Sequence, residues 1–409
     1  MKKNLRNILS IALSCTLLIG ALASCGGNGE PSAEKNQNVS GKNKENPATA
    51  EGGGEDRAFE AFKTGVLVAD VSGEEALAFR DYYENYIAEQ YPIEFLYSEQ
   101  LEDAASERSA IEKFAAQGCK AIISFSGSDR ARQIESCEEN KLYYAVASGM
   151  LDDKQYEEHK DSPYFVAQIG PSMETEYNAG REMGKYFLEQ GAEKIALYGA
   201  FIPNPMHVYR AAGVLSGLGL SYGGSDDKDA VAGQIFQDQG IKLEKVSGDQ
   251  AELAAYFQGY GDTTTDELNA AIQAEPDAFI SVGMATTFFT QQLNTSAVPF
   301  SDIDSFTSGN RKAMEEGELT YLAGKYSSSV GPVIAAVINA VNGHPLRNED
   351  GSALSVSQDY QVASDLESFD RYFKADRGSS PIYDKNLLDQ MIGQDTDLET
   401  FTKLVHNPA

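Results

Sequence analysis

The stretch "YFVAQIGPSMETEYNAGREMGKYFLEQGAEKIALYGA", residues 164–200, contains one complete strand–helix–strand unit. Tyr164–Gly170 and Lys194–Ala200 are short apolar runs, which are typical of buried strands. Met173–Gln190 lies between them and reads as a helix, and Gly191 follows at the position where glycine commonly ends one. The stretch therefore predicts a right-handed βαβ unit with parallel strands.

The same alternation precedes this unit. The expected strands are Thr64–Asp70, Ile93–Ser98, Cys119–Ser126 and Leu142–Ser148, and the expected helices are Glu74–Gln90, Ala104–Gln117 and Arg130–Asn140. Apolar strands that alternate with amphipathic helices predict a parallel sheet covered on both faces.

A second block of the same kind follows. It comprises helix Val208–Leu218, a polar surface insertion Gly219–Gly240, strand Ile241–Gly248, helix Thr265–Ala274, strand Ala278–Met284, the runs Ile303–Gly309 and Leu319–Tyr326, and helix Val333–Val341. The fold class that we expect is α/β, with two doubly wound, Rossmann-like parallel-sheet lobes. Ligands of such sheets lie outside the carboxyl ends of the strands, so we expect a cleft between the lobes.

The composition limits the possible functions. The chain has 409 residues, 42% of them apolar, and a formal net charge of −29. That length suits two domains of ordinary size, and that charge disfavours binding to nucleic acid, whose phosphates it would repel. The four histidines are scattered and form no metal-ligand pattern, so we expect no metal and no cofactor. Cys119 and Cys137 have no zinc-ligand spacing, and we favour free buried thiols over a disulfide.

The N-terminal segment has the parts of an export signal. Lys2, Lys3 and Arg6 form a basic start, and the apolar run Ile8–Leu22 is too short for a comfortable membrane span. "LASC", Leu22–Cys25, resembles the lipobox of bacterial lipoproteins, and the resemblance implies that Cys25 is acylated after removal of residues 1–24. The alternative is an ordinary secreted protein with a chance cysteine. Residues 25–58 are mainly small and polar and predict a flexible tether.

Three stretches, Gln168–Ala200, Met206–Leu218 and Arg311–Gly343, resemble the type I periplasmic binding proteins, the ribose-binding-protein group that shares its fold with LacI-type effector domains. The resemblance runs from Lys63 to about Ser368. It implies two lobes joined by three crossovers, near 168–170, 325–327 and 350–357, which close over a small molecule by hinge bending. The expected lobes are 59–168 plus 326–352 and 169–325 plus 353–409.

Polar and aromatic residues at the expected strand ends are the candidate ligand contacts. They are Asp70, Ser72, Ser126, Asp129 and Ser148 in the first lobe, and His207, Arg210, Met284, Phe306, Thr307 and Lys325 in the second. We rank Arg210 first because its guanidinium offers five donors in a rigid fork and it falls where the family often uses arginine. The alternative is an arginine salt-bridged on its own helix.

The chain departs from the sugar binders of that group. Ser148-Gly149 replaces an Asp-Arg pair, Gly283-Met284 replaces an Asn-Asp pair, and Lys325 and Ser327 replace a glutamine and a proline. A site that cannot pair sugar hydroxyls should reject a simple pentose or hexose. Lys325 and Arg210 could instead favour an anionic or carbonyl-rich ligand, unless Lys325 is only a solvated rim residue.

These observations predict a monomeric, lipid-anchored extracytoplasmic solute-binding protein that delivers a small polar ligand to an ABC permease. A ligand-sensing lipoprotein that reports to a membrane receptor is the alternative. A surface enzyme or adhesin is less favoured, because no nucleophile–base or paired-carboxylate cluster stands at the strand ends.

Overall fold

The computed structural model describes residues 59–200, 202, 204–259, 264–283, 285–286, 297–376 and 380–408. These residues lie in one compact unit, Arg57–Ala409. The expected export signal, Cys25, the tether and Met284 lie outside the described residues. No helix among the described residues is long and apolar enough to cross a membrane.

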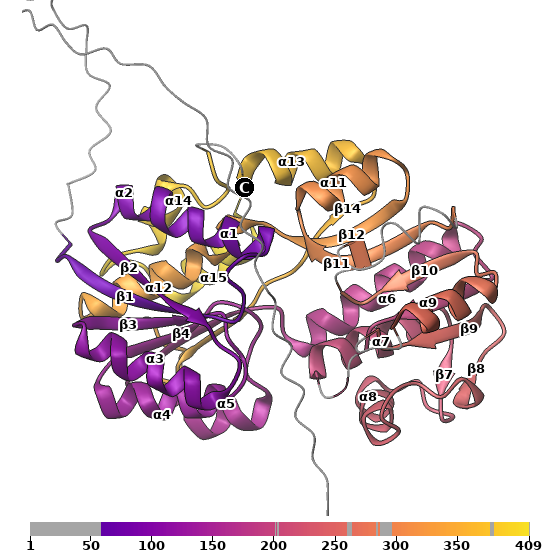
Figure 1. Ribbon diagram of the computed structural model, residues 1–409. Helices are drawn as coiled ribbons and strands as arrows, with labels where there is room; N and C mark the ends of the chain where they lie inside the picture. The colour runs from indigo at the N-terminus through magenta and orange to yellow at the C-terminus, as the bar shows by residue number, and fades with distance from the viewer. Residues whose placement is uncertain are drawn as a thin grey trace, which may run out of the picture. The chain divides into compact units, whose positions relative to one another are not determined.

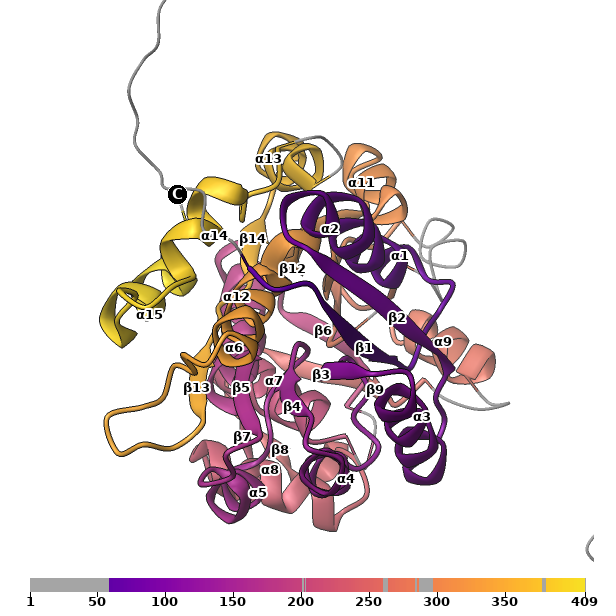
Figure 2. The same cartoon turned by 90° about the vertical axis from the view of Figure 1, so that its left-hand side faces the viewer.

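The first lobe is built on a six-stranded parallel sheet (Figures 1 and 2). Its order is β13 (Leu354–Ser357), β5 (Phe165–Gly170), β4 (Tyr143–Val146), β3 (Cys119–Ser124), β1 (Phe62–Val68) and β2 (Ile93–Gln100). Helices α3 (Ala104–Ala116) and α4 (Arg130–Asn140) cover one face, and α1 (Glu74–Asp81) and α12 (Gly331–Val341) cover the other. Val66 and Leu67 are both fully buried because neighbouring side chains of a strand point to opposite, covered faces.

The second lobe repeats this arrangement. Its sheet has the order β14 (Gln361–Ala363), β12 (Leu319–Lys325), β11 (Phe300–Ser305), β10 (Ala278–Ser281), β6 (Lys194–Tyr198) and β9 (Glu252–Phe257), and only β14 is antiparallel to its neighbour. Helices α6 (Met173–Glu189) and α7 (Pro205–Gly217) pack on one face, and α9 (Thr264–Gln273) and α11 (Ser308–Glu315) pack on the other. The expected fold class, two doubly wound parallel-sheet lobes, is confirmed.

Glycines let α6 and α7 approach closely. A Cβ on Gly180 would lie 2.0 Å from the carbonyl oxygen of Arg210, and one on Gly213 would lie 2.0 Å from that of Tyr177. Neither position can hold a side chain without moving a helix backbone, so these two glycines set the distance between the helices.

The chain passes between the lobes at four places. It passes after β5 and after β12, as expected, but the third passage lies at 358–360, between β13 and β14. It returns a fourth time, because α13 (Leu366–Asp376) packs on α11 and β14 whereas α14 (Lys385–Met391) packs on α12. Assigning all of 353–409 to the second lobe was therefore wrong: β13 pairs with β5, and α14 and α15 (Leu398–His406) lie with the first lobe (Figures 1 and 2).

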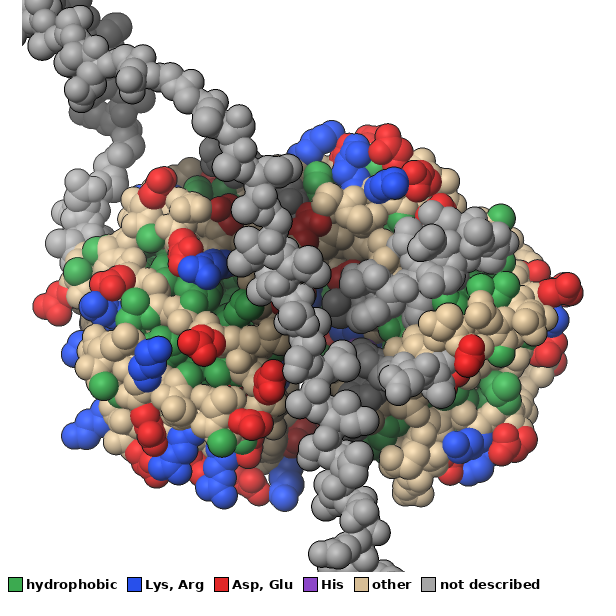
Figure 3. Space-filling view, in the orientation of Figure 1, with side chains coloured by type: hydrophobic (Ala, Val, Ile, Leu, Met, Phe, Trp, Pro, Cys, Tyr) green, Lys and Arg blue, Asp and Glu red, His purple; other side chains and the backbone are tan. Residues whose placement is uncertain are grey.

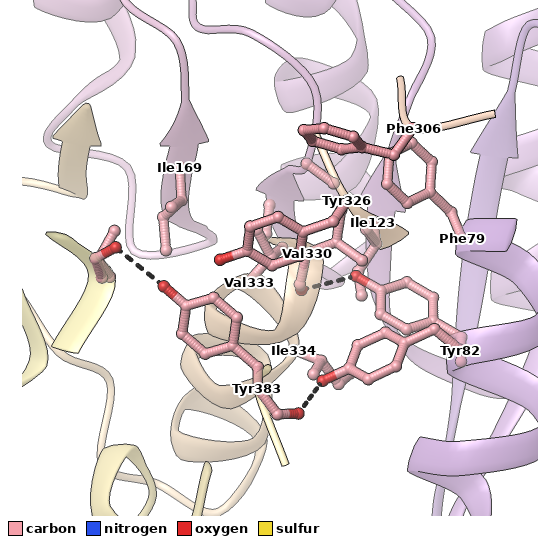
Figure 4. Packing of buried hydrophobic residues seen from close by; sticks show 14 of the residues in the cluster. Phe79, Tyr82, Ile123, Ile169, Phe306, Tyr326, Val330, Val333, Ile334 and Tyr383 are labelled. Carbon is pink, nitrogen blue, oxygen red and sulfur yellow. Dashed lines mark hydrogen bonds between the residues drawn. The ribbon is translucent and has the colours of Figure 1, made fainter. Parts of the chain in front are cut away.

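Tyrosine hydroxyls form hydrogen bonds between this C-terminal segment and the first lobe, and within the segment. The hydroxyl of Tyr82 donates to the carbonyl oxygen of Tyr383 at 2.6 Å, and the hydroxyl of Tyr383 donates to the carbonyl oxygen of Val405 at 2.9 Å (Figure 4). The hydroxyl of Tyr91 donates to Asp389 at 2.8 Å. Tyr82 begins a π-helical turn, Tyr82–Ile87, within the helical run that continues from α1. We call residues 380–408 the C-terminal clasp.

One local expectation was wrong. The strand expected at Ile241–Gly248 is a 3₁₀ turn, Leu243–Lys245, followed by the two-residue strand β8 (Val246–Ser247), and the sheet strand comes later, as β9. The insertion expected at 219–240 contains β7 (Ser221–Tyr222) and helix α8 (Lys228–Gln237). The strand was wrongly expected because Ile241 and Leu243 alternate with polar residues, but the alternation breaks at Lys245.

Both cysteines of the described residues are free and buried, as expected. Burial raises the pKa of Cys119 to about 11, so the thiol stays protonated and unreactive at neutral pH.

Candidate functional site

Two adjoining pockets form a cleft where the lobes meet. The α1 pocket, of about 530 Å³, lies between α1 and the carboxyl ends of β11 and β12. The strand-end pocket, of about 130 Å³, lies at the carboxyl ends of the first lobe's strands. Both pockets are lined by Glu75, Phe79 and Arg80, so they are parts of one cleft. The cleft lies where parallel sheets of this kind bind ligands.

Five of the eleven candidate residues line this cleft. Asp70 and Ser148 line the strand-end pocket, and Phe306, Thr307 and Lys325 line the α1 pocket. Their positions follow from the strand ends that precede them. Their role in ligand binding stays a prediction.

Asp70 is held in a turn that directly follows β1. Its carboxylate accepts hydrogen bonds from the backbone N–H groups of Ser72, at 2.9 Å, and Gly73, at 3.1 Å. These bonds lower the pKa of Asp70, and the bond from Ser72 has the largest effect. Ser72 itself is exposed and lines neither pocket.

Two first-lobe candidates have local structural roles. Ser126 is buried, and its hydroxyl donates to the buried carboxylate of Glu107 at 2.5 Å. Asp129 caps α4, because its side chain accepts the N–H of Arg132 at 3.1 Å. Neither residue lines the described pockets: Ser126 bonds to Glu107 of α3, and Asp129 bonds to the backbone of α4.

Arg210 is buried in the second lobe and fully engaged by protein groups. Its Nε donates to Glu176 at 2.6 Å, Nη1 donates to the carbonyl oxygen of Val282 at 2.7 Å, and Nη2 donates to the hydroxyl of Tyr360 at 2.7 Å. The ion pair joins α7 to α6, whereas the alternative given above placed the partner on the same helix.

His207 lies beside Arg210 in the same buried region. Burial, followed by the charge of Arg210, lowers the pKa of His207 to about 3, so its imidazole is neutral at physiological pH. Its Nδ1 is buried without a hydrogen-bond partner in the described part of the chain. Neither His207 nor Arg210 lines the cleft pockets.

The first turn of α1 contributes residues that the sequence interpretation missed. The carboxylate of Glu74 accepts hydrogen bonds from the backbone N–H of Ser308, at 2.8 Å, and from its hydroxyl, at 2.6 Å. The hydroxyl of Ser305 donates to Glu75. The signal that could have identified these acids is their position, because the first turn of α1 follows the carboxyl end of β1, where ligands of such sheets bind.

Aromatic rings complete the cleft. Phe79 and Phe306 come from different lobes and both line the α1 pocket (Figure 4). Phe79 stacks on Phe125 with ring centroids 5.3 Å apart, and Phe306 lies 4.9 Å from Tyr372. Such faces suit the apolar side of a sugar ring or another flat ligand.

The α1 pocket is acidic. It is lined by Glu74, Glu75, Asp81 and Glu84, against Arg80 and Lys325, and Arg80 is paired with Glu84 at 2.9 Å. Lys325 faces these acids, and Arg210 is neutralised elsewhere by Glu176. The two cations therefore do not form the joint anion site that the sequence suggested. On the face shown in Figure 3, the described acidic and basic side chains are interspersed over both lobes.

Asp304, at the end of β11, lies behind this pocket. Burial, followed by the charge of Glu75, raises the pKa of Asp304 to about 6, while Lys325 opposes the shift. Burial also raises the pKa of its neighbour Asp302 well above the usual range.

Asp304→Asn is expected to remove a pH dependence of stability. The folded protein binds a proton at Asp304 more tightly than the unfolded chain does, because the pKa of Asp304 is raised from 3.8 to about 6. This stabilises the folded state fully below pH 3.8, and the stabilisation is lost as the pH rises through about 6. Relative to Asp304→Asn, the wild type should therefore lose about 2–3 kcal/mol of unfolding free energy between pH 4 and pH 7. Urea titrations at several pH values measure this difference.

Asp277→Asn is the control with the opposite sign. The N–H groups of Lys194 and Glu193 lower the pKa of Asp277, so the wild type should lose its advantage over this variant as the pH falls. A difference between wild type and Asp304→Asn that does not change with pH would contradict the expected titration.

Two six-stranded parallel-rich sheets, with several chain passages between them and a cleft at their strand ends, define the two-lobed fold of the type I periplasmic binding proteins. No protein-family model and no curated protein matches the chain.

Solved structures of this fold do match. The arabinose-transporter binding protein of Shewanella sp. ANA-3, bound to L-arabinofuranose, is 16% identical with a TM-score of 0.53, over 77% of this chain and 95% of that one. An ABC-transporter solute-binding protein of Bacillus halodurans C-125 with myo-inositol is 15% identical with a TM-score of 0.55, over 78% and 99%. One of Actinobacillus succinogenes 130z with D-allose is 14% identical with a TM-score of 0.56, over 76% and 99%. At these identities the likeness shows the fold.

Proposed function

We propose that this chain is an extracytoplasmic solute-binding protein that holds a small polar molecule between its two lobes. The observation that carries the proposal is the cleft itself, which is lined by carboxylates of the first lobe and by aromatic rings of both lobes. The solved structures of the same fold with bound arabinofuranose, myo-inositol or allose support this choice of ligand class.

The finer parts of the proposal rest on the sequence. The export signal and the "LASC" motif support a lipid anchor at Cys25 on the outer face of the membrane. From there the binding domain would deliver its ligand to an ABC permease in the same membrane. We expect a monomer without enzymatic activity. The alternative, a sensing lipoprotein that reports to a receptor, shares the anchor and the cleft.

Ligand binding is tested by a thermal-shift screen of the full chain against neutral sugars, polyols, sugar acids, nucleosides and amino acids. A ligand that binds only the folded form raises the melting temperature, by an amount that grows with its concentration. Isothermal titration calorimetry then gives the dissociation constant of each positive compound. If no compound in any class raised the melting temperature, the proposal would be wrong.

Glu75→Gln tests whether the ligand occupies this cleft. Glu75 lines both pockets, and its carboxylate can accept hydrogen bonds from ligand hydroxyls, so we expect binding to weaken at least tenfold. Glu89→Gln is the matched control, because Glu89 is exposed and lines neither pocket. Equal affinities in the two variants would place the ligand elsewhere.

A further inference from the structure

The guanidinium of Arg130 lies at the carboxyl ends of β3 and β4. Arg130 is the first residue of α4, and its Nη1 donates to the carbonyl oxygen of Met150 at 2.9 Å. Its Nη2 donates to the carbonyl oxygen of Ser148. Ser148 lines the strand-end pocket, whereas Met150 lines a third pocket, of about 680 Å³, beside the hinge residues Ser172 and Ser357. Arg130 itself lines none of the three pockets, but its guanidinium holds the backbone of one residue from each of two of them.

Arg130 has no counter-charge at ion-pairing distance among the described residues. Both of its hydrogen-bond partners are neutral carbonyls, and its Nε is buried without a partner in the described part of the chain. Arg210, by contrast, is paired with Glu176. The Arg130 charge is therefore partly buried without an ion-pair partner among the described residues, which is uncommon because burial of an unpaired charge is costly.

The one acid that acts electrostatically on Arg130 is already engaged. The carboxylate of Glu107 accepts hydrogen bonds from the hydroxyl of Ser126 and from the backbone N–H groups of Ser128 and Asp129, both at 3.1 Å. Burial lowers the pKa of Arg130 and outweighs the opposing effects of Tyr144 and Glu107. The N–H groups of Arg130 that do not bond Ser148 or Met150 remain available to a ligand.

Arg130 also lies where the lobes approach each other. A Cβ on Gly149 would lie 3.7 Å from Nη1 of Arg130 and 3.4 Å from the sulfur of Met206, which belongs to α7 of the second lobe. A Cβ on Gly127 would lie 3.5 Å from Nη2. No side chain at 127 or 149 therefore stands between the guanidinium and a molecule held between the lobes.

We infer that Arg130 is the charged ligand contact of the first lobe and that the ligand is a hydroxylated carboxylate of the sugar-acid class. The planar guanidinium fork matches a carboxylate, which would supply the missing counter-charge. The carboxylates of Asp70 and Glu75, which line the adjoining pocket, suit the hydroxyl groups of the same molecule. This inference rests on the proposed function.

Calorimetry on the full chain with matched neutral and acidic sugars tests the inference. The probes are galactose against galacturonate and glucose against glucuronate. The wild type should bind at least one acid ten times more tightly than its neutral partner. Arg130→Gln should remove that preference by weakening the binding of the acid at least tenfold more than the binding of its neutral partner.

Arg132→Gln is the matched control. Arg132 lies in the same helical turn, but its side chain is 71% exposed and paired with Glu135, so acid binding should be unchanged. Arg130→Lys keeps the charge without the fork and should bind the acid at least fivefold more weakly than the wild type. If Arg130→Gln does not fold, Arg130→Lys alone tests the inference. An affinity of Arg130→Lys for the acid equal to that of the wild type would overturn it.

The failure of this inference is distinct from the failure of the proposed function. Neutral sugars that bind as well as the acids, with equal affinity in wild type and Arg130→Gln, would overturn the role of Arg130 and leave the solute-binding function intact. If no compound of the wider screen bound the wild type, the proposed function would fail and this inference with it.

Discussion

Arg210→Ala is expected to lower the free energy of unfolding by about 3–5 kcal/mol, because it leaves a buried carboxylate without its counter-charge. Glu176 is fully buried and would retain only the hydroxyl of Tyr360, at 3.1 Å. The carbonyl oxygen of Val282 would also lose its donor. Equilibrium unfolding in guanidinium chloride, compared with the wild type, measures the loss.

Two further variants separate charge burial from other effects. The double variant Arg210→Met with Glu176→Leu removes both charges and should recover most of the stability, because buried ion pairs often exchange for apolar residues at little cost. Arg181→Ala removes an arginine from α6 that is 38% exposed and paired with Glu182, and should change stability by less than about 0.5 kcal/mol. A stable Arg210→Ala protein that lost ligand affinity would instead restore Arg210 as a ligand contact.

Tyr383→Ala is expected to cost about 3–5 kcal/mol, as for other large-to-small changes in a core. The side chain is fully buried, and its ring lies 6.4 Å from that of Tyr326, beside the second passage between the lobes. Its hydroxyl also holds the carbonyl oxygens of Leu404 and Val405, at the end of α15. Removal of the ring should therefore loosen the whole C-terminal clasp.

Hydrogen exchange distinguishes a loosened clasp from a general loss of stability. In Tyr383→Ala, the amides of α15 should lose protection before those of the sheet strands, because local opening requires fewer contacts to break. Tyr383→Phe keeps the ring and removes only the hydroxyl, so it should cost about 1 kcal/mol. Uniform loss of protection across the unit in Tyr383→Ala would show that the clasp does not open separately.

The strands and helices of the first lobe could be predicted because their signals are local. Arg130–Asn140 begins and ends at the expected residues, since Asp129 caps its N-terminus and the apolar positions repeat at helical spacing. The strand β9 could not be placed in this way. It is an edge strand, and although Leu253–Phe257 is a continuous apolar run, its two alanines are residues that strands disfavour.

The C-terminal quarter shows what local signals cannot decide. β13 has four residues, and nothing in that run states whether it pairs with β5 or with a strand of the second lobe. The clasp likewise depends on contacts between residues about three hundred positions apart, such as Tyr82 with Tyr383. The family resemblance predicted three passages between the lobes, and the fourth follows only from these long-range contacts.

The sequence by itself determined the two α/β blocks and the edge of the sheets where ligands bind, because strand and helix periodicity and the direction of parallel strands are local properties. It therefore placed Asp70, Ser148, Phe306, Thr307 and Lys325 at the cleft. Only the tertiary structure decided which arginine is neutralised. Arg210 meets Glu176, thirty-four residues away on another helix, whereas the hydrogen-bond partners of Arg130 among the described residues are carbonyl oxygens. A buried charge is defined by its neighbours, and those neighbours come together only when the chain folds.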